Sequence, residues 1–220
     1  MTLPAVQLNS LYRSYGRQKV LVNINLVVNS GRILRITGGN GAGKTTLLRI
    51  LATGLQPSKG TGLIYGANLV GEADKARRRL LYLGSASGNS PILTARENLS
   101  FSAKVYGAPI PDINQVLEVI GLTKSADRTV RTFSTGMKKR LGIGRLLLIP
   151  ADLWLLDEPY AGLDQEGTTL VNNLLFDALE DGKTVIFTSH ALEDSPFPNE
   201  ATLELVNGRL CTRDSKVNHV

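Results

Sequence analysis

The chain has 220 residues, of which 42% are hydrophobic, a formal net charge of +6 and a single cysteine, Cys211. This size and composition are typical of one globular domain with a buried core. They exclude a disulfide-stabilised scaffold, and no apolar run approaches the roughly 18 residues needed to cross a bilayer. The first residues lack the basic and apolar regions of a secretory signal, so we expect a cytoplasmic chain. We interpret Cys211 as a strand residue rather than a nucleophile.

The positive charge is compatible with a nucleotide, an anionic membrane face or a nucleic acid, and it does not discriminate among them. The densest basic run, at residues 75–79, directly precedes the apolar residues 80–83. We interpret this run as a solvated helix face that leads into a buried strand. Nucleic-acid binding is favoured where basic residues alternate with exposed aromatic residues, and the run lacks them. We therefore expect no nucleic-acid partner.

The predicted elements follow one another as strands, then helices, then strands and helices again. Strands are expected at residues 5–8, 20–28 and 32–36, separated by turn-forming residues around Gly16 and Gly31. Apolar residues at helical spacing predict helices at 45–52, 94–106, 113–120, 136–148 and 167–179. Residues 153–156 and 184–188 are short, continuous apolar runs, which are typical of strands buried on both faces of a parallel sheet.

This order predicts an α/β fold with a doubly wound parallel sheet, interrupted by a helical insert. We expect one domain over residues 1–220. Its catalytic core with a β-subdomain covers 1–86 and 150–213, its helical subdomain covers 87–149, and its loose polar tail covers 214–220.

Residues 38–45 have the sequence G-G-N-G-A-G-K-T, which satisfies the G-x-x-x-x-G-K-[ST] pattern of a phosphate-binding loop (P-loop). The expected strand before it and helix after it are the context that this motif requires. Backbone N–H groups must approach the phosphates closely, which favours glycine, and the helix adds its positive dipole end. Lys44 would contact the β- and γ-phosphates, and Thr45 would ligate Mg²⁺. The residues expected to hold ATP and Mg²⁺ here are Gly38, Asn40, Gly41, Ala42, Gly43, Lys44, Thr45 and Thr46.

Two acids, Asp157 and Glu158, follow the apolar strand at 153–156. The carboxyl ends of strands are where a doubly wound sheet presents ligand-binding groups. Successive strand residues point in opposite directions, so we expect Asp157 to hold the metal and Glu158 to orient the attacking water. His190 follows the strand at 184–188 and is expected to contact the γ-phosphate. Lys44, Glu158 and His190 are thus the candidate catalytic residues.

Residues 133–140, F-S-T-G-M-K-K-R, resemble the signature sequence of ATP-binding-cassette (ABC) proteins in a Ser-Thr-Gly-Met variant. Ser134 and Gly136 would bind an anion at a helix N-terminus. The resemblance implies that this helix end meets the γ-phosphate held by a second nucleotide-binding domain, so that two ATP molecules lie between two chains. It also implies the ABC-type P-loop NTPase fold, with a RecA-like core, an N-terminal antiparallel β-subdomain and an inserted helical subdomain.

Other residues carry the same resemblance. Tyr15 corresponds to the aromatic residue that stacks on adenine, with Tyr12 as the alternative. Asp164 belongs to the segment A-G-L-D, which resembles the D-loop that contacts the partner domain. One element departs from the pattern, because Ser85 stands where the family has a glutamine that reaches the metal and reports to the membrane subunits. Serine is too short for that contact, although a bridging water could replace it.

The closest subgroup resemblance is to the ATP-binding subunit of the haem exporter of cytochrome c maturation, carried by residues 35–40, 80–84, 93–99 and 153–159. It implies a second, identical cassette as partner and integral membrane permease subunits that hold the chain at the cytoplasmic face of a membrane. The Ser-Thr-Gly-Met variant and Ser85 resemble generic ABC-2-type exporters of drugs, lipids or polysaccharides instead. A soluble ABC ATPase and a regulatory, non-hydrolysing cassette remain alternatives.

Overall fold

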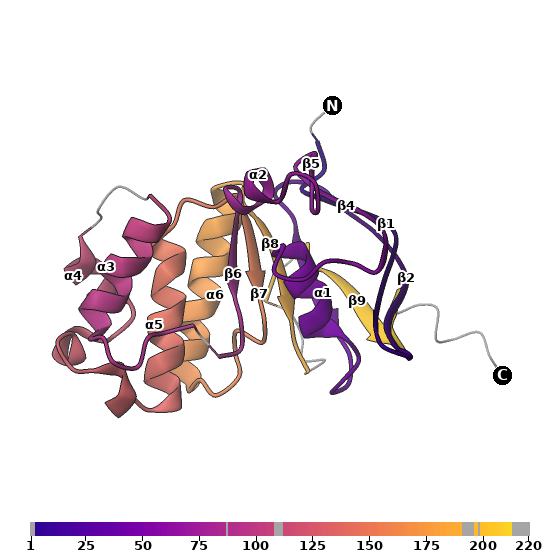
Figure 1. Ribbon diagram of the computed structural model, residues 1–220. Coiled ribbons are helices and arrows are strands. Elements are labelled where there is room, and N and C mark those ends of the chain that lie inside the picture. Colours follow the sequence, from indigo (N-terminus) through magenta and orange to yellow (C-terminus); the bar gives the residue numbers. More distant parts are fainter. Residues whose placement is uncertain (1–2, 87, 108–111, 191–195, 198, 213–220) are drawn as a thin grey trace.

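Two β-sheets organise the chain (Figure 1). The computed structural model describes residues 3–86, 88–107, 112–190, 196–197 and 199–212. The smaller sheet is antiparallel, with the strand order β2-β1-β4-β5. Its strands are β1 (Val6–Tyr15), β2 (Gln18–Val28), β4 (Lys59–Ile64) and β5 (Ala67–Asn68).

The larger sheet has six strands in the order β10-β9-β3-β8-β7-β6. These strands are β3 (Ile33–Thr37), β6 (Leu80–Leu83), β7 (Leu153–Leu156), β8 (Thr184–Thr188), β9 (Ala201–Val206) and β10 (Arg209–Thr212). All neighbours from β9 to β6 are parallel, and β10 adds an antiparallel edge. Strand β8 separates β3 from β7, so the carboxyl ends of these three strands lie next to one another.

Both faces of the larger sheet are buried, and alternate residues of β7 serve different cores. Leu153 and Leu155 pack with β1, β2 and the helix that follows β3. Trp154 and Leu156 pack on the opposite face with the helices of the chain's second half. The continuous apolar sequence of this strand is therefore explained by burial on two sides.

The helices fall into two groups in Figure 1. Helices α3, α4 and α5 lie together at one end of the molecule, and α1 lies near the β-subdomain at the other. The helices are α1 (Lys44–Leu51), α2 (Ala73–Arg77), α3 (Ala95–Val105), α4 (Ile113–Val119), α5 (Thr135–Leu148) and α6 (Gln165–Glu180). Side-chain caps fix several starts: Thr94 and Glu97 form a capping box on α3, and Asp112 caps α4.

Among the described residues, no helix combines the length and the apolar character that crossing a bilayer requires. Two short 3₁₀ turns, at Thr123–Ser125 and Val130–Thr132, connect α4 to α5.

The structure confirms every predicted strand and helix, with β1 extending seven residues further than the predicted end at residue 8. Cys211 lies on β10, as expected of a strand residue, and the basic run forms α2 and the turn before β6. Strands β4, β5 and β9 were not predicted, and β10 was expected only through Cys211. The predicted tail and its His219 lie outside the described residues, and the subdomain boundaries remain a prediction.

Candidate nucleotide site

Three loops meet where β3, β8 and β7 end. The loop after β3 is the P-loop, the residues after β7 are the two acids, and His190 follows β8. The strand order alone brings them together, because β8 is hydrogen-bonded to both other strands.

The P-loop has the backbone that its glycines were predicted to supply. Gly38, Gly41 and Gly43 have φ angles of 145°, 75° and 108°, which side chains with a Cβ rarely adopt. Helix α1 begins directly after Gly43, so its first N–H groups have no side-chain cap and face the loop. The Lys44 ammonium donates to the carbonyl oxygens of Gly38 and Gly39 at 2.7 and 3.2 Å. The loop therefore presents free backbone N–H groups around Lys44, whose ammonium is fixed by two carbonyl oxygens of the same loop.

The backbone of Gly38 leaves no room for a side chain, and this predicts a large effect of substitution. A Cβ at this position would lie 2.5 Å from the Leu205 carbonyl oxygen. We expect Gly38→Ala to lower Tm and to weaken ATP binding at least about tenfold, since the loop must shift. Gly39→Ala is the matched control, because nothing lies within 4 Å of its Cβ. Calorimetry and titration with a fluorescent ATP analogue measure both, and equal effects of the two variants would contradict this account.

Asp157 is 2% exposed and accepts two hydroxyl hydrogen bonds. The Thr45 hydroxyl donates to its Oδ2 at 2.8 Å, and the Thr188 hydroxyl donates to its Oδ1 at 2.8 Å. The Thr45 hydroxyl and the Asp157 carboxylate are hard oxygen donors of the kind Mg²⁺ prefers, and two protein ligands leave positions for phosphate and water. The two residues predicted to hold Mg²⁺ thus lie in contact and fit the ion.

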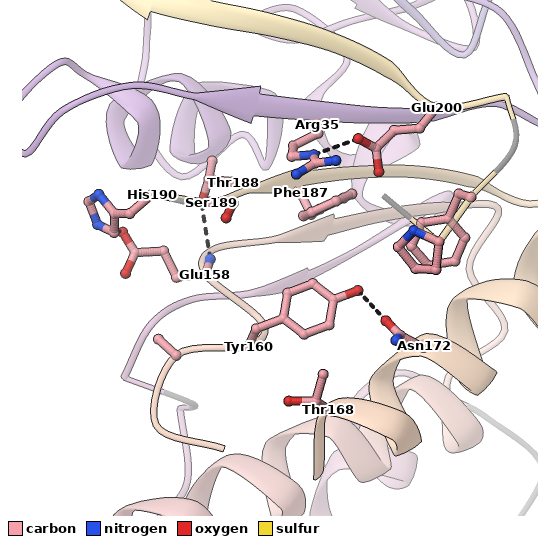
Figure 2. Close-up of a pocket in the computed structure, with 13 residues that line it drawn as sticks. Arg35, Glu158, Tyr160, Thr168, Asn172, Phe187, Thr188, Ser189, His190 and Glu200 are labelled. Carbon is pink, nitrogen blue, oxygen red and sulfur yellow. Dashed lines mark hydrogen bonds and ion pairs between the residues drawn. The ribbon is translucent and has the colours of Figure 1, made fainter. Parts of the chain in front are cut away.

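Glu158, His190 and Lys44 form a continuous chain of polar contacts. His190 Nε2 lies 2.5 Å from Glu158 Oε1, and His190 Nδ1 lies 3.4 Å from Lys44 Nζ. An ammonium group can only donate, so Nδ1 is the acceptor and Nε2 carries the hydrogen toward Glu158. Figure 2 shows the Glu158 carboxylate beside the imidazole ring. All three predicted catalytic residues are therefore in one place.

Burial lowers the pKa of Lys44, and the negative charges of Glu158 and Asp157 act in the opposite direction. The side chain is 6% exposed. A desolvated ammonium group close to two carboxylates is placed to compensate phosphate charge more strongly than it would in water.

The Glu158 backbone has an unusual conformation for a residue with a side chain. Its φ is 53°, in the left-handed region, which costs about 1–3 kcal/mol and persists only where neighbours enforce it. The Glu158 N–H donates to the Thr188 hydroxyl at 3.0 Å, and the Glu158 carbonyl oxygen accepts from the Lys139 ammonium at 2.6 Å. Hydrogen bonds at both the N–H and the carbonyl oxygen of Glu158 thus hold the turn in which the side chains of Asp157 and Glu158 point in different directions.

A cavity of about 400 Å³ opens beside this turn, and Figure 2 shows the residues that line it. Glu158 and His190 line it together with Arg35, Tyr160, Phe187 and Glu200. None of the P-loop residues is among the described residues that line it. The nucleotide cradle is instead an open surface, on which Asn40, Gly41 and Thr45 are exposed.

Ser134 and Gly136, which were also predicted to contact ATP, do not lie beside the P-loop of their own chain. Ser134 caps α5 by accepting from the Met137 N–H at 3.2 Å, and α5 is well separated from α1 in Figure 1. Gly136 lies beside Gly162, since its Cβ position is 3.6 Å from the Gly162 carbonyl oxygen. The signature and the predicted D-loop are therefore neighbours, and both carry exposed residues.

Asp164 caps α6 through the Gly167 N–H at 2.8 Å and pairs with Arg140 at 2.8 Å. Backbone and arginine contacts lower the pKa of Asp164, so it is anionic. Tyr15 is 47% exposed at the end of β1, with the Arg13 guanidinium over its ring. An exposed ring suits stacking on a base, while Tyr12 is half-buried. The adenine role of Tyr15 and the partner role of Asp164 remain predictions.

Two residues of the site were missed from the sequence, Thr188 and Lys139. Thr188 is the last residue of a strand that has three apolar residues between two threonines, and a threonine at that position is a weak signal. Lys139 is one of three consecutive basic residues, and only the structure distinguishes it as the buried one.

The comparisons with known proteins agree with this site. Residues 21–161 match the model of the family described as ABC transporter. This chain belongs to the ABC transporter family. Membership confirms the predicted fold class and the predicted ATP-binding subunit.

Relatives in this family include exporters of different kinds. The cytochrome c biogenesis ATP-binding export protein CcmA of Xanthomonas campestris pv. campestris (strain 8004) is 39% identical over 88% of this chain and 90% of that protein. The Nod factor export ATP-binding protein I of Ralstonia nicotianae (strain ATCC BAA-1114 / GMI1000) is 33% identical over 94% of this chain and 65% of that protein. The first relative confirms the predicted resemblance to the cytochrome c maturation subgroup of ABC proteins.

A solved structure gives the same fold. It is the dimeric structure of a post-hydrolysis state of the ATP-binding cassette MJ0796 bound to ADP and Pi. It has a TM-score of 0.83 at 25% identity and covers 93% of this chain and 96% of that chain.

Proposed function

We propose that this ABC protein hydrolyses Mg-ATP as half of a homodimer and drives export through separate membrane subunits, with haem as the cargo. The observation that carries the ATPase proposal is the contact network of Lys44, Glu158 and His190 beside the Thr45–Asp157 pair. A regulatory cassette without hydrolysis would not need this complete set.

In the proposed reaction, residues 38–45 bind the triphosphate through backbone N–H groups, and Lys44 exchanges its two carbonyl contacts for phosphate oxygens. Thr45 and Asp157 would hold Mg²⁺, which neutralises developing charge on the phosphate oxygens when bound. Glu158 orients the attacking water and accepts its proton, while His190 positions Glu158 and contacts the γ-phosphate. Asp157 stays fixed by Thr188 during this step.

The proposal of a dimer rests on the exposure of both halves of the site. The cradle is open at Asn40 and Gly41, and Ser134 at the N-terminus of α5 is exposed as well. A helix N-terminus binds anions through its free N–H groups and its dipole, and a second copy arranged head to tail would bring Ser134 and Gly136 onto the γ-phosphate. Loss of that phosphate after hydrolysis then weakens the closed state, which is the working step.

The cargo is proposed from sequence similarity, because no residue of a nucleotide domain touches cargo. The CcmA relative supports haem export for cytochrome c biogenesis. The Nod factor exporter supports a second candidate, an exporter of another cargo, and the Ser-Thr-Gly-Met signature agrees with it.

Complementation tests the cargo directly. The chain and its own membrane subunits are expressed in bacteria that lack the ATP-binding subunit and permease of cytochrome c maturation, and covalent haem in c-type cytochromes is measured by in-gel peroxidase staining. We expect the wild-type chain to restore staining and Lys44→Ala to fail. A wild-type chain that is an active ATPase with those subunits but restores no staining would contradict haem export and favour the other cargo.

A further inference from the structure

We infer that Lys139 is a positioning residue for the catalytic carboxylate, linking the signature helix of each chain to its own Glu158. This inference rests on the proposed role of Glu158 as the group that orients water. No P-loop or strand-tip motif includes Lys139, and its contact becomes visible only in the fold.

The ammonium of Lys139 is buried, which is uncommon for a charged lysine side chain. The side chain is 8% exposed, and burial lowers its pKa, opposed by the charges of Asp157 and Glu158. Its Nζ donates to the Glu158 carbonyl oxygen at 2.6 Å. Burying a lysine in a helix that is otherwise apolar on this side is unfavourable unless the group is hydrogen-bonded. The contact compensates for that burial.

The contact acts on the peptide that decides where the carboxylate points. Glu158 has a φ of 53°, so its backbone does not adopt this conformation without restraint. Thr188 holds its N–H at 3.0 Å and Lys139 holds its carbonyl oxygen at 2.6 Å. Without the second contact, the peptide can relax and turn the carboxylate away from the water and from His190.

Helix α5 joins this contact to the surface that faces a second chain. Ser134 caps the helix, and Lys139 follows five residues later, about 7.5 Å along the axis. The same helix also receives the segment after Ser85, because the Asn89 side chain donates to the Lys138 carbonyl oxygen at 2.7 Å. Arg145 also donates to the Gly88 carbonyl oxygen at 3.0 Å. A displacement of α5 by a nucleotide at Ser134 is therefore passed to Glu158 through Lys139.

The test compares three replacements of Lys139 that differ in whether they carry a hydrogen-bond donor and in how far that donor extends. Met has no donor, Gln has a donor one bond shorter, and Arg keeps both the charge and the reach. We expect Lys139→Met and Lys139→Gln to lower kcat for ATP roughly tenfold with KM within about twofold, because misplaced catalytic groups slow chemistry more than binding. We expect Lys139→Arg to keep at least about half of the wild-type kcat. Lys124→Met, the same change at an exposed site on a 3₁₀ turn, is the control and should leave kcat unchanged.

Two further measurements distinguish a positioning role of Lys139 from a purely structural role. Thermal unfolding identifies which variants remain folded, and kcat is compared only among those. In a Glu158→Gln background, Lys139→Met should cause no further loss of the residual rate, because both changes remove the same function. A folded Met or Gln variant with wild-type kcat overturns the inference. Normal hydrolysis by Glu158→Gln alone would instead overturn the proposed role of Glu158, so the two failures are distinguishable.

Discussion

Replacing Glu158 by glutamine should lower ATP turnover by at least about a hundredfold while ATP binding is retained. Glutamine keeps the shape of the side chain and a hydrogen bond to His190, but it cannot accept a proton from the attacking water. The P-loop contacts lie between the end of β3 and the start of α1 and are not altered by the change. The rate is measured as phosphate release in a single turnover, and binding with a fluorescent ATP analogue.

The control is Glu180→Gln, the same chemical change at an exposed position at the end of α6. It should hydrolyse ATP at the wild-type rate. Near-normal hydrolysis by Glu158→Gln would discard Glu158 as the general base and leave His190 as the remaining candidate at this position.

Lys44→Ala is expected to reduce ATP affinity by about ten- to a hundredfold and to abolish measurable turnover. The ammonium donates to two carbonyl oxygens of the loop at 2.7 and 3.2 Å, and in the ATP complex phosphate oxygens would replace these carbonyls as its acceptors. Its removal also deprives His190 Nδ1 of the nearest donor. Affinity is measured by isothermal titration with ATP and Mg²⁺.

Lys59→Ala, at an exposed position on β4, serves as the control for loss of a positive charge. Overall charge contributes to the attraction of an anionic nucleotide at long range, so the control shows how much of the loss is general. Equal losses of affinity in Lys44→Ala and Lys59→Ala would remove Lys44 from the site.

The central strands and the position of the site could be predicted from the sequence because the relevant signals are local. A P-loop requires its glycines and lysine at fixed spacing, and the acids at 157–158 and the histidine at 190 each end an apolar run. Parallel strands that share one edge then bring these ends together. The sequence order alone does not show that β8 lies between β3 and β7, which explains why Thr188 was missed.

Other parts depend on contacts between distant segments. Strand β4 contains two glycines and is exposed over its first half, so it has neither strand composition nor alternation, and its pairing with β1 defines it. Lys139 is adjacent in sequence to two similar basic residues. Its role depends on the position of α5 relative to the turn at Glu158, because that position decides which lysine reaches the Glu158 carbonyl oxygen. The spacing of residues within 133–140 does not determine this position.

Ser85 stands where the family has a glutamine, and neighbouring residues of the site provide polar contacts in this region. Tyr82 lies three residues earlier, on β6, and burial, with a smaller contribution from the negative charge of Asp157, raises the pKa of its hydroxyl to about 12. Its hydroxyl is therefore a neutral donor near the proposed metal ligand. The segment that follows Ser85 is attached to α5 by Asn89 and Arg145, so it stays connected to the signature helix without a glutamine.

The central claim is that Ser134 of one chain completes the nucleotide site of another. Light scattering after gel filtration tests it on the Glu158→Gln chain, with and without Ser134→Arg, each in the presence and absence of Mg-ATP. We predict the mass of two chains only for Glu158→Gln with Mg-ATP, and the mass of one chain whenever Ser134 is replaced. A monomer under all conditions, or an ATP-dependent dimer that is indifferent to Ser134→Arg, would contradict the account.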